Sequence, residues 1–394
     1  MIHFGIVSFE INPSVYPVLK HLCSYLEEKY GYPIDTLVDG IAKPIDYSNK
    51  EMNLINLLPP SFYNYSFSMK NVIFLWRIIY RTKQFYFSVK KKINSYLTKI
   101  RLKYMINKYD FIFCIEAYSL VALEKINFNF RKVIYISLES TQAFNSDLEL
   151  LKYKYLLEEC RYCIIQSKER AEDFERELGV KTRIKFLPVS MRPINCINKR
   201  VTFTNRKAQL VHTGYLAEWT HLKDFLNIYL SEQNIDNPLY IHSYSKGVES
   251  YFLDITRLVN YKSSIKFDIS FMDEEDHFIF LSGMDIGLVF YKNIDDSINW
   301  KNMFFSSHKL ASYLWAGLAI MTNIESQYTD QPPFIKITRF TKEEIWTAVK
   351  KYEKEPQRYH DSAREMAKQL FNLDKYMDEI TCNRLKGNIK TGKY

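Results

Sequence analysis

The stretch "SSHKLASYLWAGLAIM", from Ser306 to Met321, carries the signals of a helix followed directly by a buried strand. Serines of the type that cap helix N-termini precede a lysine and an apolar pattern with helical spacing. Gly317 is typical of a helix end, and "LAIM" is typical of a strand inside a sheet. The stretch therefore predicts an α/β fold, with a helix that begins near Ser306 or Ser307.

The start of this helix also predicts an anion site. First-turn amides have no partner within a helix, and the helix dipole adds partial positive charge there. Lys309 adds a full charge, and the two serines add hydroxyl groups. Such a combination suits a diphosphate. The alternative interpretation is an ordinary capped amphipathic helix with a lysine near its start.

The alternation of strands and helices extends from this stretch toward the N-terminus. Near-continuous apolar strands separated by helical patterns predict parallel sheets that are covered on both faces. A polar, basic stretch, Arg192 to Lys207, is expected to link two domains, over 1–195 and 205–365. A terminal helix at about 366–394 is expected to pack back on the first domain. The strand candidates are "IHFGIVSF", "DFIFCIEA", "KVIYISLES", "YCIIQS", "IKFLPVS", "AQLVHTG", "LYIHSYS", "SIKFDIS", "DIGLVFY" and "LAIMTN".

The composition of the 394-residue chain indicates the cellular compartment in which it acts. It has no run of about 20 apolar residues, so we expect no transmembrane helix. The N-terminal residues indicate a first strand, since they lack the basic flank and cleavage site of a signal peptide. The six cysteines show no disulfide or complete zinc pattern. We therefore expect a cytoplasmic protein without a metal or other cofactor.

Much of the +9 net charge lies between Lys70 and Lys108, a span that contains no acidic residue. Apolar and aromatic residues separate the basic ones, as in "NVIFLWRIIYRTKQFYFSV". A basic stretch with aromatic anchors favours contact with anionic lipid, here at the inner face of the plasma membrane. A solvated helical face is the plainer interpretation. Nucleic acid is not expected as a partner, because no nucleic-acid motif accompanies the charge.

In its order of motifs the chain resembles GT-B glycosyltransferases, and more narrowly their bacterial GT4-like branch. "KLASYLWAGLAIM" is similar to the branch's "K-L-x-E-Y-x-x-x-G-x-P-V-I". "MDIGLVFY", "QLVHTGYL" and "CIIQSKERAEDFERELGV" resemble its neighbouring elements, and the similarity covers about residues 110–370. The resemblance implies two Rossmann-like, doubly wound domains that face each other across a cleft. It also implies that the second domain binds a nucleotide sugar.

The resemblance places the donor site on residues of the second domain. It implies that Gly214 lets the backbone approach the donor closely and that Ser312 meets the ribose. The diphosphate is expected at Ser306, Ser307, His308 and Lys309. Ser243 and Tyr244 are expected to border the donor, and Phe271 and Met272 are expected to contact its base.

The chain departs from the GT4 pattern at two positions. Phe304 and Ser312 stand where that branch has two glutamates that contact the donor sugar and the ribose. A phenylalanine cannot replace a carboxylate, so the resemblance does not carry over a donor sugar or a retaining reaction.

An inverting reaction needs a base for the acceptor hydroxyl. Glu10, Glu116 and Glu139 follow strand candidates of the first domain. "VIYISLES" resembles an element of some bacterial relatives, which favours Glu139, with Glu10 next. The alternative role for Glu139 is to cap the following turn.

The sequence thus predicts a glycosyltransferase that uses a nucleotide-sugar donor and a cell-surface glycan or polyprenyl-linked acceptor. A non-catalytic GT-B partner subunit and a transferase for a protein acceptor remain the alternatives, and a GT-B epimerase or phosphorylase has no residue in its favour.

Overall fold

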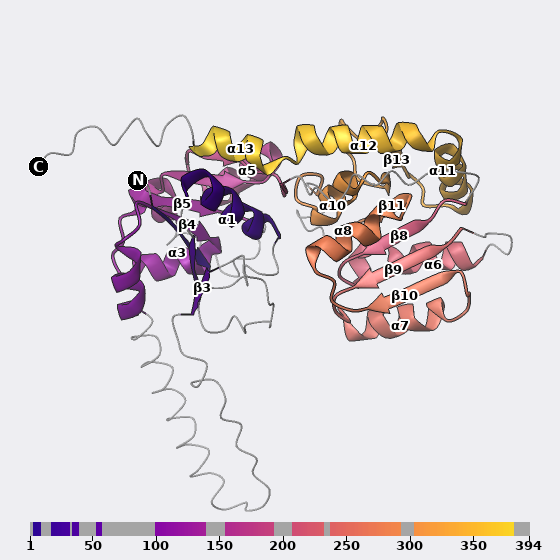
Figure 1. Cartoon of the computed structure of the whole chain (residues 1–394), viewed down its shortest axis with the longest axis horizontal. Helices are drawn as coiled ribbons and strands as arrows, with labels where there is room; N and C mark the ends of the chain where they lie inside the picture. The colour runs from indigo at the N-terminus through magenta and orange to yellow at the C-terminus, as the bar shows by residue number, and fades with distance from the viewer. Residues whose placement is uncertain are drawn as a thin grey trace, which may run out of the picture. The chain divides into compact units, whose positions relative to one another are not determined.

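The computed structural model describes residues 3–8, 17–31, 34–38, 53–56, 99–138, 154–192, 207–231, 237–292 and 303–381. They belong to two compact units, one within residues 1–187 and the other across residues 188–382 (Figure 1). Each unit carries a parallel β-sheet with helices packed on both faces, which confirms the predicted α/β class.

The sheet of the first unit has the strand order β3-β2-β1-β4-β5-β6-β7, and all of its pairs are parallel. Its strands are β1 (Phe4–Ser8), β2 (Asp35–Val38), β3 (Asn53–Asn56), β4 (Phe111–Ile115), β5 (Val133–Ile136), β6 (Tyr162–Ile165) and β7 (Ile184–Phe186). Its helices include α1 (Pro17–Tyr30), α3 (Glu116–Glu124) and α5 (Lys168–Leu178).

Successive side chains of these strands point to opposite faces of the sheet, so each face forms its own layer of the core. Val7, Ile112 and Tyr135 pack with α3 and α5 on one face. On the other face the Phe4 ring lies 4.9 Å from the ring of Tyr30 in α1. A sheet covered on both faces explains why the strands are near-continuous apolar runs.

The sheet of the second unit has the order β10-β9-β8-β11-β12-β13, again with parallel pairs only. Its strands are β8 (Leu210–Thr213), β9 (Leu239–Ser243), β10 (Ile265–Ile269), β11 (Ile286–Val289), β12 (Ala319–Thr322) and β13 (Phe334–Lys336). Its helices include α6 (Leu222–Leu230), α7 (Glu249–Val259), α8 (Glu274–Ser282), α10 (His308–Ala316), α11 (Lys342–Lys354), α12 (Pro356–Leu370) and α13 (Leu373–Thr381).

Helix α10 occupies the middle of one face of this sheet. It packs with α8 and α12, while α6, α7 and α11 cover the opposite face. Gly287 of β11 has no side chain, and the Tyr313 ring of α10 takes the space above it. The sheet order reverses between β8 and β11, so the start of α10 lies at the edge where ligands of such sheets bind.

Three strands do not appear among the sequence candidates: β2, β3 and β13. Each is three or four residues long and contains a charged residue or asparagine. In the sheet β2 pairs with β1, β3 with β2, and β13 with β12. The returning tail at 366–394 stays a prediction, because residues 382–394 lie outside the described ranges.

Candidate donor site

Helix α10 begins where the sequence predicts. Ser307 is its N-cap, and the Ser307 hydroxyl oxygen accepts a hydrogen bond of 3.2 Å from the Leu310 amide. The same oxygen lies 2.7 Å from the Tyr291 hydroxyl, and both side chains are buried. At the other end Gly317 adopts a φ of +86°, the left-handed conformation of a glycine C-cap.

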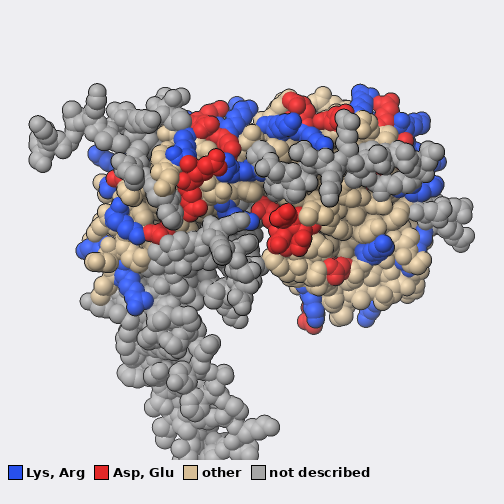
Figure 2. Space-filling view, in the orientation of Figure 1, with Lys and Arg blue, Asp and Glu red and all other residues tan. Residues whose placement is uncertain are grey.

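The first turns of α10 and of its neighbour α8 differ in charge. Asp273 caps α8, and three acidic residues occupy its first turn. Figure 2 shows the acidic side chains that gather over this part of the second unit. The first turn of α10 contains no acidic residue. The acidic residues of α8 compensate the positive potential of its N-terminus. The N-terminus of α10 lacks such compensation and can attract an anion.

Lys309 and Gly214 meet at this helix start, although they lie in different elements. A Cβ atom on Gly214 would lie 3.5 Å from Cε of Lys309, and Gly214 has a φ of +105°. No carboxylate among the described residues forms an ion pair with Lys309. Burial lowers the pKa of this lysine from its ordinary 10.5 to about 7. The side chain of Lys309 therefore lies beside Gly214, the only residue without a side chain between β8 and α6.

His212, His242 and His277 lie near the same helix start as His308. Sequence analysis predicts only His308 as a donor-binding residue. The ring of His242, near the end of β9, lies 6.3 Å from that of His277 in α8. Burial, followed by the charge of His308, lowers the pKa of His277 to about 4. His212 in β8 is buried, and burial together with Lys309 lowers its pKa. The lowered pKa values keep His277 and His212 neutral near neutral pH.

Two of these histidines, His212 and His242, occupy the same position in their strands, and this repeat is visible in the sequence. "LVHT" ends β8 and "YIHS" ends β9, and both place a histidine one residue before the strand's last position. Among the described residues, no group of three or more His, Cys, Asp and Glu side chains is arranged to hold a metal ion.

The remaining predicted donor residues lie in the loops around this edge or in α10 itself. The buried Ser243 hydroxyl donates a 2.6 Å hydrogen bond to the Ser245 carbonyl, which shapes the turn after β9. Tyr244 and Phe271, after β9 and β10, are exposed, and Met272 beside Phe271 is half-buried. Ser306 is also half-buried, at the α10 start.

Ser312 and Phe304 are both directed into the protein. Ser312 is 1% exposed, and its hydroxyl donates a 2.9 Å hydrogen bond to the carbonyl of His308. Phe304 is buried, with its ring 5.1 Å from that of Tyr328 and 5.6 Å from that of Phe334. In this arrangement the ribose contact predicted for Ser312 requires the hydroxyl to leave its helical partner.

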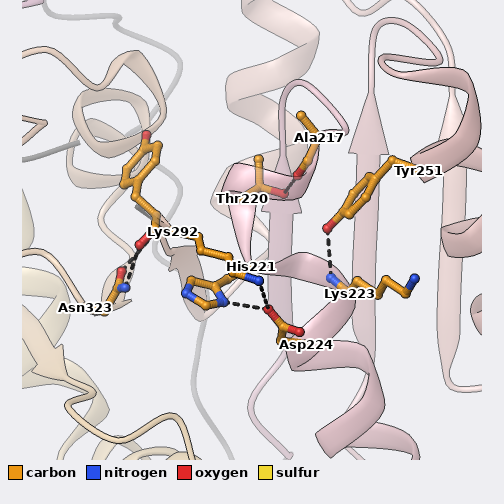
Figure 3. A network of polar contacts seen from close by, with 9 residues as sticks. Ala217, Thr220, His221, Lys223, Asp224, Tyr251, Lys292 and Asn323 are labelled. Carbon is orange, nitrogen blue, oxygen red and sulfur yellow. Dashed lines mark hydrogen bonds and ion pairs between the residues drawn. The ribbon is translucent and has the colours of Figure 1, made fainter. Parts of the chain in front are cut away.

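Polar contacts fix the loop that follows Gly214 (Figure 3). His221 adopts a φ of +53°, and its Nδ1 lies 2.7 Å from a carboxylate oxygen of Asp224. Lys292 extends toward the same carboxylate from the end of β11, at 4.0 Å. The Thr220 hydroxyl donates to the carbonyl of Ala217 at 2.6 Å. The loop is therefore held against the end of β11, beside the α10 start.

In the first unit, the candidate bases Glu10 and Glu139 lie outside the described residues. Glu116 is described: it is buried directly after β4, with a φ of +57°. Its carboxylate accepts a hydrogen bond from the amide of Leu138, the residue before Glu139. Sequence analysis gives Glu116 no preference over Glu139 or Glu10, and a left-handed conformation at a glutamate leaves no signal in the sequence.

Most of the basic segment also lies outside the described residues, which include only its end, 99–108. Arg101, Lys103 and Tyr104 are exposed there, whereas Leu102 and Ile106 are buried. Where the structure is described, no helix combines the length and apolar character needed to cross a bilayer.

Comparison with known proteins identifies the fold. HepE from Anabaena, solved in complex with UDP and glucose, matches with a TM-score of 0.62 and 12% identity over 96% of this chain and 98% of HepE. Sucrose-phosphate synthase from Thermosynechococcus elongatus matches with a TM-score of 0.64 and 12% identity, over 98% and 100% of the two chains. A glycosyltransferase from Rickettsia africae matches with a TM-score of 0.64 and 10% identity, over 99% of each chain.

No family model and no curated protein matches the sequence. The structural matches cover both units, and their common architecture is that of the GT-B glycosyltransferases. The chain therefore has the GT-B fold, as the sequence predicts.

Proposed function

We propose that this chain is a glycosyltransferase that transfers a sugar from a nucleotide-sugar donor, and that the start of α10 holds the donor's diphosphate. The contact between Lys309 and Gly214 carries the proposal. It places a cation without a carboxylate partner beside an open backbone and beside first-turn amides. HepE, which shares the fold, has been solved with UDP-glucose bound, and this supports a donor of that class.

The chemistry requires the leaving charge to be stabilised. The acceptor hydroxyl oxygen forms a bond to the anomeric carbon, and the bond from that carbon to the phosphate oxygen breaks. The bonding electrons leave with the nucleoside diphosphate, and the acceptor hydroxyl loses its proton to a base. In this proposal Lys309 and the α10 amides stabilise the charge on the departing diphosphate. We assign the base to Glu139, or to Glu10 as the second candidate, and we expect no metal requirement.

We further propose a cell-surface glycan or a polyprenyl-linked saccharide as the acceptor. The basic and aromatic residues between Lys70 and Lys108 support this assignment, because they suit anionic lipid. At its described end this segment exposes Arg101, Lys103 and Tyr104 together. In this proposal the protein works at the cytoplasmic face of the plasma membrane.

A thermal-shift panel of UDP-, GDP-, CMP- and dTDP-sugars tests the donor site. A ligand that binds only the folded state raises the melting temperature with its concentration. We expect one nucleotide class to do so, and the shift to shrink in Lys309→Ala. Lys168→Ala is the control, because Lys168 occupies the first turn of α5 in the other unit. An equal shift in wild type and Lys309→Ala would place the diphosphate elsewhere, and no shift at all would contradict a donor site.

One observation favours a second candidate, a non-catalytic GT-B partner subunit. Phe304, where the GT4 pattern has a glutamate, is packed among aromatic rings instead of facing a ligand. Turnover separates the two candidates. Hydrolysis or transfer of the donor sugar by the purified chain supports the enzyme, whereas donor binding without turnover until a second subunit is added supports the partner.

A further inference from the structure

Exposed aromatic side chains gather at the ligand-binding edge of the second unit. Among its described residues, the aromatic side chains more than a third exposed are Tyr215, Trp219, Tyr244, Tyr261 and Phe271. All but Tyr261 follow the carboxyl ends of β8, β9 and β10. Apolar surface concentrated at one edge marks a binding site, whereas scattered exposed residues do not.

The ring of Trp219 is supported by a neighbouring ring. It stacks on the ring of Tyr291 with centroids 5.8 Å apart and the planes 6° from parallel. The carbonyl of Trp219 accepts a 2.8 Å hydrogen bond from the amide of Lys292. Tyr291 is buried, whereas Trp219 is 39% exposed. Tyr291 therefore supports the indole by an offset stack and leaves more than a third of Trp219 exposed.

This platform is linked directly to the proposed diphosphate site. The hydroxyl of Tyr291 lies 2.7 Å from the hydroxyl oxygen of Ser307, the N-cap of α10. The Trp219 ring is therefore fixed, through one intervening side chain, relative to the helix start. The polar network of Figure 3 holds the rest of the loop in the same place.

The order of strands indicates which part of a donor reaches Trp219. Phe271 and Met272, the expected base contacts, follow β10, and Gly214 beside Lys309 follows β8, two strands away. Parallel strands lie about 4.8 Å apart, so this separation is roughly 10 Å, enough to place a nucleoside before its diphosphate. The Trp219–Tyr291 stack joins the loop after β8 to the end of β11, which is one strand further from β10. The group beyond the diphosphate in a nucleotide sugar is the sugar.

We propose that Trp219 is the platform on which the donor's sugar ring packs. The inference rests on the proposed function and extends it to the sugar subsite. The face of an aromatic ring carries partial negative charge, and the C–H groups on one side of a pyranose carry partial positive charge. An indole that already stacks on a buried ring and is partly exposed offers such a face without having to become ordered on binding.

Dissociation constants of UDP-glucose and UDP for wild type, Trp219→Ala and Trp219→Phe test the assignment. We expect Trp219→Ala to weaken UDP-glucose about fivefold to tenfold and to leave UDP within about twofold, because UDP lacks the sugar. Trp219→Phe keeps a flat ring and should recover most of the loss. Tyr261→Ala is the matched control, since Tyr261 is 78% exposed and follows α7 instead of a strand.

The outcomes separate the assignment from the proposed function. An equal loss for UDP and UDP-glucose in Trp219→Ala, with an unchanged melting temperature, would place the base or the phosphates on this ring and overturn the sugar assignment. Unchanged affinity for both ligands would overturn it as well. If wild type binds no sugar nucleotide of the thermal-shift panel, the proposed donor site itself fails and the sugar subsite fails with it.

Discussion

Lys309 gives donor binding an expected pH dependence. Its pKa in the free protein is about 7 because burial disfavours the charged form. A bound diphosphate favours the charged form, so above pH 7 binding must take up a proton. We therefore expect the affinity for UDP-glucose to fall as pH rises, approaching about tenfold per unit above pH 8. UDP-glucose suits the measurement because its diphosphate has no terminal ionisation near pH 7.

The replacement Lys309→Arg isolates this effect in the same titration. Arginine stays protonated at every pH of the experiment, so its pH profile should be flat above pH 7. His277 and His212 do not contribute to the profile above pH 7, since burial lowers the pKa of His277 to about 4 and that of His212 well below its usual value. A profile in Lys309→Arg as steep as that of wild type would assign the proton to another group.

At the level of single residues, the sequence predicts charge and helix capping better than it predicts which distant residues come together in the fold. Ser307 and Gly317 are visible in the sequence because capping is local. His277 is not, because its proximity to His242 arises from the packing of α8 beside β9. For Ser312 the ribose contact stays a prediction: a hydroxyl can reach a ligand or its own helix, and here it donates to the carbonyl of His308.

At the level of the helix, the N-cap of α10 should matter for stability and for binding together. Ser307→Ala removes the acceptor of the Leu310 amide and should cost about 1 kcal/mol of unfolding free energy. Thr341→Ala removes the corresponding cap of α11, where the Thr341 side chain accepts from Glu344. Both variants should lose similar stability in urea, but only Ser307→Ala should also bind UDP-glucose more weakly. A matching loss of affinity in Thr341→Ala would mean that stability alone governs binding.

The packing of α10 against the sheet depends on Gly287 of β11. A Cβ atom there would lie 2.1 Å from a ring carbon of Tyr313, which is fully buried. The Tyr313 hydroxyl also accepts a 2.7 Å hydrogen bond from the Thr213 amide, so the ring cannot move freely. We expect Gly287→Ala to cost about 1–3 kcal/mol in chemical denaturation and to weaken donor binding by shifting Lys309.

Gly283→Ala is the control for this substitution. Gly283 has a φ of −84°, and its nearest neighbour would lie 3.4 Å from an added Cβ. Its effect should stay within about 0.5 kcal/mol. Equal stability of Gly287→Ala and Gly283→Ala would show that the Tyr313 ring relaxes and that Gly287 does not fix the helix.

For the molecule as a whole, sequence periodicity was sufficient for the fold class but not for every strand. Continuous apolar runs such as "FIFCI" in β4 can only be buried on both faces, which implies parallel sheets. Strands β2 and β13 lack such runs, and their pairing partners hold them in place. The left-handed Glu116 is likewise set by the contact of its carboxylate with Leu138, a partner that is distant in sequence.

The charge of the whole molecule predicts binding to anionic vesicles. The net charge is +9, and the acid-free span from Lys70 to Lys108 concentrates basic and aromatic residues. We expect the full chain to sediment with vesicles that contain phosphatidylglycerol, and not with neutral phosphatidylcholine vesicles. Binding should weaken steeply as salt rises from 50 mM to 300 mM, because surface attraction falls off over a Debye length of about 10 Å at 0.1 M.

Two double variants with the same change of net charge test whether this span is the docking site. Arg101→Glu/Lys103→Glu alters its described end, where both side chains are exposed, and Lys350→Glu/Lys351→Glu alters exposed positions of α11. Each basic residue near an anionic surface contributes about 1 kcal/mol, so only the first variant should lose binding more than tenfold. Equal losses would assign the attraction to net charge without a defined site. If wild type fails to bind even at 50 mM salt, the basic residues are a solvated helical face, and the acceptor must reach the enzyme without membrane docking.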